Sequence, residues 1–161
     1  MDDAALGEMI AAIQSDRARW ASAIANPWFG NGLPGVSVSP ELVEWAVGLF
    51  LKASPKAAID MQRASFATDL RPDARAVRVP TLIVHGDSDM MIPFEVSGRK
   101  VAEAIPHGEL RVYENASHGL FVSHMDRLNA DLLSFVGGSR CLPGGIDSSV
   151  TPTRSARREF Q

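Results

Sequence analysis

The chain has 161 residues, of which 45% are hydrophobic and 22% are charged, so its composition is that of a globular protein and excludes wholesale disorder. Its formal net charge of −3 excludes the dense basic surface that nucleic-acid binding requires. The single cysteine, Cys141, cannot form an internal disulfide, which excludes a disulfide-stapled secreted domain. The N-terminus is acidic where a signal peptide would be basic, and no apolar run approaches the roughly eighteen residues of a membrane span. We therefore expect a cytoplasmic protein that does not enter a membrane.

Residues 1–70 are predicted to be helical. Apolar residues recur near every 3.6 positions over 6–24, which predicts an amphipathic helix that ends before an Asn-Pro pair. Residues 26–38 include five Gly or Pro residues and are predicted to form a loop. Two Ser-Pro pairs then combine a capping hydroxyl with a proline in the first turn, which predicts helices over 39–53 and 54–68.

Residues 71–136 change in character and are predicted to alternate strands and helices. The first strand is a short, nearly continuous apolar run, as expected of a strand buried on both faces of a parallel sheet. The order strand, helix, strand, helix predicts an α/β fold with parallel strands. The expected strands cover 79–84 and 110–114, and the expected helices cover 96–105 and 120–136.

Residues 137–161 are predicted to be a disordered tail. They are rich in Gly, Ser, Pro and Arg and have only scattered apolar residues, so burial cannot offset their ordering entropy. The alternative is an arm that binds an acidic partner through Arg154, Arg157 and Arg158.

Titratable residues follow both predicted strands, where the carboxyl ends of parallel strands place reactive groups. The first strand leads into His85-Gly86-Asp87-Ser88-Asp89, and the second leads into Asn115-Ala116-Ser117-His118-Gly119. A carboxylate can fix the tautomer of an imidazole and stabilise its cation while the imidazole moves a proton. The two loops therefore predict the acid and base of a nucleophilic triad.

The segments VPTLIVHGDSDMMIP and AIPHGELRVYENASHGLFVSHMDRLNADLLSFV resemble the α/β-hydrolase fold, within it the cofactor-free (non-haem) haloperoxidase and aryl-esterase group. The resemblance covers about 79–136, and a looser one extends over 4–70, which looks like the helical cap of that group. It implies that Asp89, in an HGxxDxxxP loop closed by Pro93, is the triad acid and that His118 is the base. Asp87 is the competing acid, although its position in the pattern is usually structural.

The resemblance also suggests which residues surround the pair. Trp28 and Phe29 in the cap could line an apolar acyl pocket, with Met91 and Ile92 as its floor, or could simply pack in the loop. Trp20 and Trp45, at helical spacing, are expected in helix–helix packing. Of the other histidines, we expect His85 to brace its loop and His124 to be structural.

The sequence does not contain the nucleophilic serine motif of this family. Members of this family carry a serine in a G-x-S-x-G turn ahead of the acid and base, and the nearest match here, Gly35-Val36-Ser37-Val38-Ser39, lacks the closing glycine and a preceding strand. The upstream segment that supplies an oxyanion-hole N–H is also missing. We therefore expect an incomplete sheet, made of the cap and the C-terminal part of the fold.

Two functions remain in competition. The first is the C-terminal part of a serine hydrolase, of carboxylic-ester hydrolase or perhydrolase/haloperoxidase type, inactive alone, whose complete form acts on a small-molecule ester or carboxylic acid without a metal or organic cofactor. The second is a non-catalytic interaction module, whose exposed sheet edge pairs with an N-terminal partner chain or with itself. A metal site from Asp87, Asp89, His118 and His124 is disfavoured, because no HxH, HExxH or CxxC spacing is present.

Overall fold

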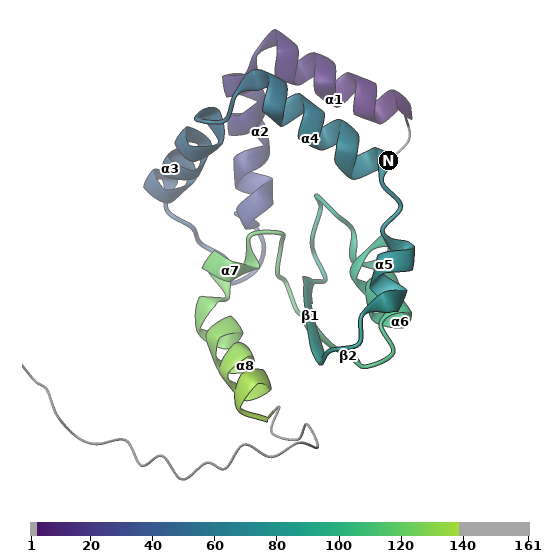
Figure 1. The fold of residues 1–161 in the computed structure, drawn as a ribbon. Helices are drawn as coiled ribbons and strands as arrows, with labels where there is room; N and C mark the ends of the chain where they lie inside the picture. The colour runs from purple at the N-terminus through teal and green to yellow at the C-terminus, as the bar shows by residue number, and fades with distance from the viewer. Residues whose placement is uncertain (1–2, 139–161) are drawn as a thin grey trace, which may run out of the picture.

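A computed structural model describes residues 3–138 of the chain (Figure 1). The first part consists of four helices, and Figure 1 shows α1 and α4 side by side across one end of the molecule. Apolar side chains of Ile10, Ile13 and Ile59 join α1 to α4, and a second cluster that includes Phe29 and Val43 joins α2 to α3. The helices are α1 (Asp3–Ser15), α2 (Arg17–Phe29), α3 (Pro40–Leu51) and α4 (Pro55–Ala67).

The capping predictions for α3 and α4 are confirmed. Ser39 Oγ accepts a hydrogen bond from the Leu42 amide at 3.2 Å, and Ser54 Oγ accepts one from the Ala57 amide at 3.0 Å. In both helices the proline occupies the first turn, where its missing N–H has no intrahelical partner to lose.

The prediction of a single first helix that ends before Pro27 is wrong at both points. The chain forms two helices, because Asp16 adopts an extended backbone and its carboxylate accepts from the Arg19 amide at 2.9 Å, starting α2. Helix α2 then continues through Pro27 to Phe29. Its end is closed by Gly30, whose left-handed backbone (φ 77°) lets its amide and the next one return to carbonyls of the last turn.

The second part contains two strands among the described residues, and they pair in parallel from Thr81 with Gly108 to Gly86 with Tyr113. The predicted strand–helix–strand–helix order is confirmed. A short helix that the sequence did not indicate precedes the first strand, and the predicted last helix is broken at His124. The elements are α5 (Arg71–Ala76), β1 (Thr81–Gly86), the 3₁₀ helix η1 (Phe94–Val96), α6 (Gly98–Ala104), β2 (Gly108–Tyr113), α7 (Leu120–Ser123) and α8 (Met125–Gly138).

The predicted C-terminal tail and the expected absence of a membrane span can be compared with the structure only over the described residues. The predicted tail starts two residues too early, since Gly137 and Gly138 still belong to α8, and 139–161 lie outside the described residues, with Cys141 and the three arginines of the proposed arm. Within 3–138, every helix is too short or too polar to cross a membrane.

A polar cluster fastens α8 to β2. The Tyr113 side chain is fully buried, and its hydroxyl donates to Asp131 Oδ2 at 2.5 Å. Arg111 donates to the other carboxylate oxygen of Asp131, also at 2.5 Å, and the guanidinium of Arg127 lies 3.8 Å from the centre of the Tyr113 ring. The hydrogen bonds from Tyr113 and Arg111 hold the pKa of Asp131 below its ordinary value. Burial, and then the hydrogen bond to Asp131, raise the pKa of Tyr113 to about 12.

We predict that Tyr113→Phe destabilises the chain by about 1 to 2 kcal/mol, because it removes a buried hydrogen-bond donor to a carboxylate. The raised pKa of Tyr113 means that its contribution is complete below about pH 10 and is lost as the pH rises toward 12. Urea unfolding of both chains should therefore show a difference near neutral pH that shrinks in strong alkali. A difference that stays constant from neutral pH to above pH 11 or so would contradict this.

Candidate active site

The loop after β1 holds Asp89 by its backbone. Asp89 is a buried residue, and its Oδ1 atom accepts hydrogen bonds from the amides of Met91 and Ile92, each at 2.9 Å. This turn is local, since the donors lie two and three residues after the acceptor, as in an Asx-type turn. One oxygen of Asp89 is thus fixed by the main chain, and the other is free to meet a second loop.

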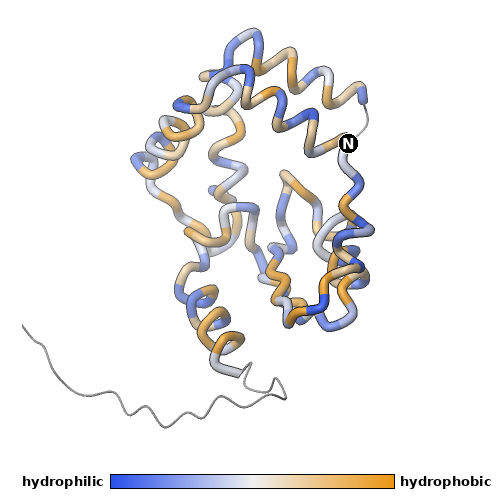
Figure 2. The backbone as a smooth tube through the Cα atoms, viewed as in Figure 1, coloured by the Kyte–Doolittle hydropathy of each residue, from blue (hydrophilic) through white to orange (hydrophobic). Residues whose placement is uncertain are grey.

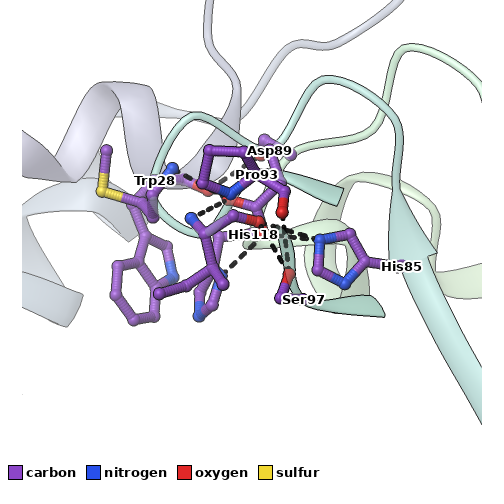
Figure 3. A network of polar contacts seen from close by, with 9 residues as sticks. Trp28, His85, Asp89, Pro93, Ser97 and His118 are labelled. Carbon is purple, nitrogen blue, oxygen red and sulfur yellow. Dashed lines mark hydrogen bonds and ion pairs between the residues drawn. The ribbon is translucent and has the colours of Figure 1, made fainter. Parts of the chain in front are cut away.

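The loop after β2 brings His118 to that second oxygen. His118 Nδ1 lies 2.8 Å from Asp89 Oδ2, although the two residues are 29 positions apart, and Figure 3 shows the imidazole turned toward the carboxylate. Because a carboxylate only accepts, Nδ1 carries the proton in this pair, and Nε2 is the ring nitrogen left for proton transfer. The His118 side chain is 33% exposed while that of Asp89 is 4% exposed, so the imidazole forms the accessible side of the pair.

The two loops meet by close backbone contact. A Cβ atom on Gly86, the last residue of β1, would lie only 2.1 Å from the carbonyl oxygen of Ala116. Two hydrogen bonds cross the same junction, from the Asp87 amide to the Tyr113 carbonyl at 3.0 Å and from the Ser88 amide to the Ala116 carbonyl at 3.1 Å. The parallel register therefore continues past the strand ends and sets the spacing between Asp89 and His118.

The end of α2 fixes the His118 loop from the other side. The Trp28 carbonyl accepts from Ser117 Oγ at 2.8 Å and from the Gly119 amide at 2.7 Å, so the residues on either side of His118 bind the same oxygen. The indole of Trp28 lies edge-on to the His118 imidazole, with ring centres 4.3 Å apart (Figure 3). No sequence pattern predicts this role for Ser117 or for the Trp28 backbone, because neither contact leaves a periodicity or a motif.

An apolar cavity of about 480 Å³ lies between α2, α3 and α7. Trp28 and Phe29 line it, and Trp28 also contacts His118, so the cavity adjoins the pair. Met91 and Ile92 are not among its lining residues, and the contacts that place them are their amide hydrogen bonds to Asp89. Trp20 and Trp45 line the cavity too, and Trp20 also packs against the ring of Phe50, with centres 5.4 Å apart.

The other titratable residues considered for the site make their contacts away from His118 Nε2. Asp87 is exposed and accepts from the Ser88 hydroxyl at 2.8 Å. His124 Nδ1 pairs with the Ser123 hydroxyl at 2.9 Å, and its ring lies beside Tyr113. His85 Nε2 lies 2.9 Å from the Ile92 carbonyl oxygen, within the loop it was expected to brace. Within 3–138, no three His, Cys, Asp or Glu side chains are grouped so that they could hold a metal ion.

Comparison with known proteins agrees with this geometry. A family model described as serine aminopeptidase S33 matches residues 49–124. The chain is 34% identical over 128 residues to a non-heme haloperoxidase of Rhodococcus erythropolis, an alignment that covers 78% of this chain and 46% of that protein. The crystal structure of a bromoperoxidase from Bacillus anthracis superposes with a TM-score of 0.80 at 33% identity, covering 85% of this chain and 50% of the other. The chain belongs to the α/β-hydrolases.

Within that family, this hydrolase chain is related to non-heme haloperoxidases and esterases. It is also 36% identical over 114 residues to a bifunctional esterase/perhydrolase of Acinetobacter calcoaceticus, covering 70% of this chain and 41% of that protein. The chain spans about half the length of the curated relatives it matches. The expected fold class, a segment of an α/β-hydrolase with two parallel strands, is therefore confirmed.

We predict that Gly86→Ala destabilises the hydrolase chain by about 2 kcal/mol or more, because the added carbon meets backbone atoms of Ala116 that cannot move independently. The control is Gly48→Ala in α3, where no atom lies within 4 Å of the added carbon. That change should stabilise the helix by about 0.5 to 1 kcal/mol. Thermal unfolding of both variants measures the difference, and equal stabilities would show that the two loops do not meet as described.

Proposed function

We propose that this chain supplies the acid and the base of a serine-hydrolase triad, of carboxylic-ester hydrolase or perhydrolase type. The observation that carries the proposal is the 2.8 Å hydrogen bond between His118 Nδ1 and Asp89 Oδ2, with the second oxygen of Asp89 held by two amides. Asp89 keeps the imidazole in one tautomer and stabilises its cation, and His118 Nε2 moves the proton. Relatives described as haloperoxidases and as an esterase/perhydrolase support this reaction class.

The chemistry at His118 follows from that arrangement. A serine hydroxyl attacks the acyl carbon while His118 Nε2 takes its proton, and the protonated imidazole then gives that proton to the leaving alcohol. Water attacks the acyl-enzyme with His118 again as the base, which releases the carboxylic acid and restores the serine. When hydrogen peroxide replaces water, the same steps release a peracid, which oxidises halide in solution. Asp89 remains ionised throughout.

The nucleophilic serine must come from a segment other than this sequence, because the sequence contains no G-x-S-x-G turn. We propose that residues 1–70 act as the cap over the site and that 71–136 form the C-terminal part of the catalytic core. The substrate is a small-molecule ester or carboxylic acid whose acyl group enters the apolar cavity and contacts Trp28 and Phe29. Met91 and Ile92 lie beside Asp89 and would contact the substrate there, outside the cavity.

The isolated chain should not hydrolyse p-nitrophenyl acetate faster than free imidazole, and a fluorophosphonate probe should not label it, because a base and an acid alone have no nucleophile to activate. Steady-state absorbance and mass spectrometry of the probe-treated protein measure the two outcomes. Stoichiometric labelling of any serine would contradict the proposal, since the chain would then contain its own nucleophile.

Activity should appear when the chain is joined to the portion of the Bacillus anthracis bromoperoxidase that the superposition does not cover. In this hybrid, Asp89→Asn and His118→Ala should each lower kcat by about 10⁴-fold, as expected for a triad member. Matched controls are Asp87→Asn and His124→Ala, which alter a neighbouring carboxylate and imidazole outside the pair and should leave kcat nearly unchanged. A loss of activity in Asp87→Asn but not in Asp89→Asn would reverse the assignment of the acid.

A second candidate function is an interaction module, which the exposed apolar face of α8 favours. Leu132, Leu133 and Val136 are 44%, 76% and 72% exposed, and Figure 2 shows the hydrophobic stretches along this helix. Among the described residues, β1 and β2 pair only with each other, so each has an edge open to another strand. A second polypeptide or a second copy of the chain could cover both features.

Sedimentation equilibrium of the full chain tests this second function. Self-association should be concentration-dependent and should weaken when Leu133→Lys places a charge on the α8 face. Ser65→Lys on α4 introduces the same charge change at an exposed site on another helix and serves as the control. A stable monomer whose β1 and β2 amides are protected from exchange would argue against the module.

A further inference from the structure

His85 and His118 both face the same carboxylate oxygen of Asp89. Its Nε2 atom lies 3.5 Å from Asp89 Oδ2, the same oxygen that faces His118, and 2.9 Å from the Ile92 carbonyl oxygen. The His85 side chain, on β1, is only 14% exposed, so this imidazole is largely buried against the loop that follows the strand. Figure 3 shows Asp89 with an imidazole on either side. The acid–base chemistry described above does not use His85.

The neighbours of His85 fix the direction of its ring. A Cβ on Gly98, at the start of α6, would lie 2.7 Å from His85 Nδ1, so the ring packs directly on the backbone of that glycine. The ring also lies beside Phe94, with centres 5.6 Å apart. Because a carbonyl oxygen only accepts, the short contact with Ile92 means that Nε2 carries the proton and donates it.

Three hydrogen bonds then link four residues in one connected series. His85 Nε2–H donates to the Ile92 carbonyl, the Ile92 amide donates to Asp89 Oδ1, and His118 Nδ1–H donates to Asp89 Oδ2. Ser97 lies near the same carbonyl at 3.5 Å, but its hydroxyl donates to the Pro93 carbonyl at 2.8 Å. His85 is therefore the short hydrogen-bond donor that restrains Ile92, the residue whose amide orients the acid.

We propose that His85 is a positioning residue: its Nε2–H holds Ile92 in place, so that Asp89 keeps Oδ2 directed at His118. This inference rests on the proposed acid–base pair and adds a residue that acts through Asp89. What the position requires is a donor of the right length, and a glutamine amide can replace the imidazole N–H there. A phenyl ring retains the packing against Gly98 and Phe94 but has no donor, so it separates the hydrogen bond from the shape of the side chain.

The test is nitrogen-15 NMR of the full chain, which follows the His118 Nδ1–H proton and its rate of exchange with water. In the unaltered chain this proton should be visible and slowly exchanging, because it is bonded to a buried carboxylate oxygen. His85→Gln should preserve it, and His85→Phe should accelerate its exchange by at least about fivefold, the effect of one lost hydrogen bond. His124→Phe is the matched control, since that imidazole contacts Tyr113 and Ser123, and it should leave the proton unchanged.

The outcomes separate this inference from the proposed function. If the unaltered chain shows no protected His118 Nδ1–H, the acid–base pair itself is wrong. If the proton is protected and stays within twofold of that rate in His85→Phe, or is lost equally in His85→Gln, the pair stands and the positioning role of His85 is overturned. Backbone amide spectra show whether β1 and β2 remain paired, and if His85→Phe fails to fold, the smaller donor-free His85→Leu decides in the same comparison.

Discussion

The carbonyl of Trp28 is the point on which the arrangement of the site depends. It belongs to the last turn of α2, where a carbonyl has no partner within its own helix. Two donors satisfy it, the Ser117 hydroxyl and the Gly119 amide, and they stand on either side of His118. A single oxygen at the end of α2 therefore fixes both neighbours of His118, and the indole of the same residue contacts the imidazole. The approach is so close that a Cβ on Gly119 would lie 3.0 Å from this oxygen.

Asp89 is positioned by a different set of hydrogen bonds, and the pairing of β1 with β2 brings its loop to the His118 loop. Asp89 is held by amides of its own loop, which belong to residues two and three positions after it. What brings the two loops together is the parallel register of β1 and β2, continued by the contact of Gly86 with Ala116. Because a shift of one residue in that register would turn each side chain to the opposite face, strand pairing is as important to the pair as either hydrogen bond.

What could be predicted from the sequence follows from the range of each interaction. The Ser-Pro starts of α3 and α4 and the turn that holds Asp89 are local, so their residues lie within a few positions of one another and leave a readable pattern. The contact of Ser117 with Trp28 spans 89 positions and involves a backbone acceptor, so no pattern announces it. Apolar spacing continues across Asp16 and predicts no break there, although aspartate is one of the preferred N-cap residues.

The apolar core of the described residues consists of small separate clusters, and this affects how the two proposed functions relate. The acid and base are held by hydrogen bonds and backbone contacts within the loops and α2, not by burial in one large core. Their geometry therefore does not depend on the presence of a nucleophile. A polypeptide that covers the α8 face and extends the sheet would add apolar burial to stabilise the fold, and a serine placed near His118 Nε2 would complete the triad. Under the two proposals, docking would come before catalysis, because the serine would arrive with the polypeptide that covers the α8 face.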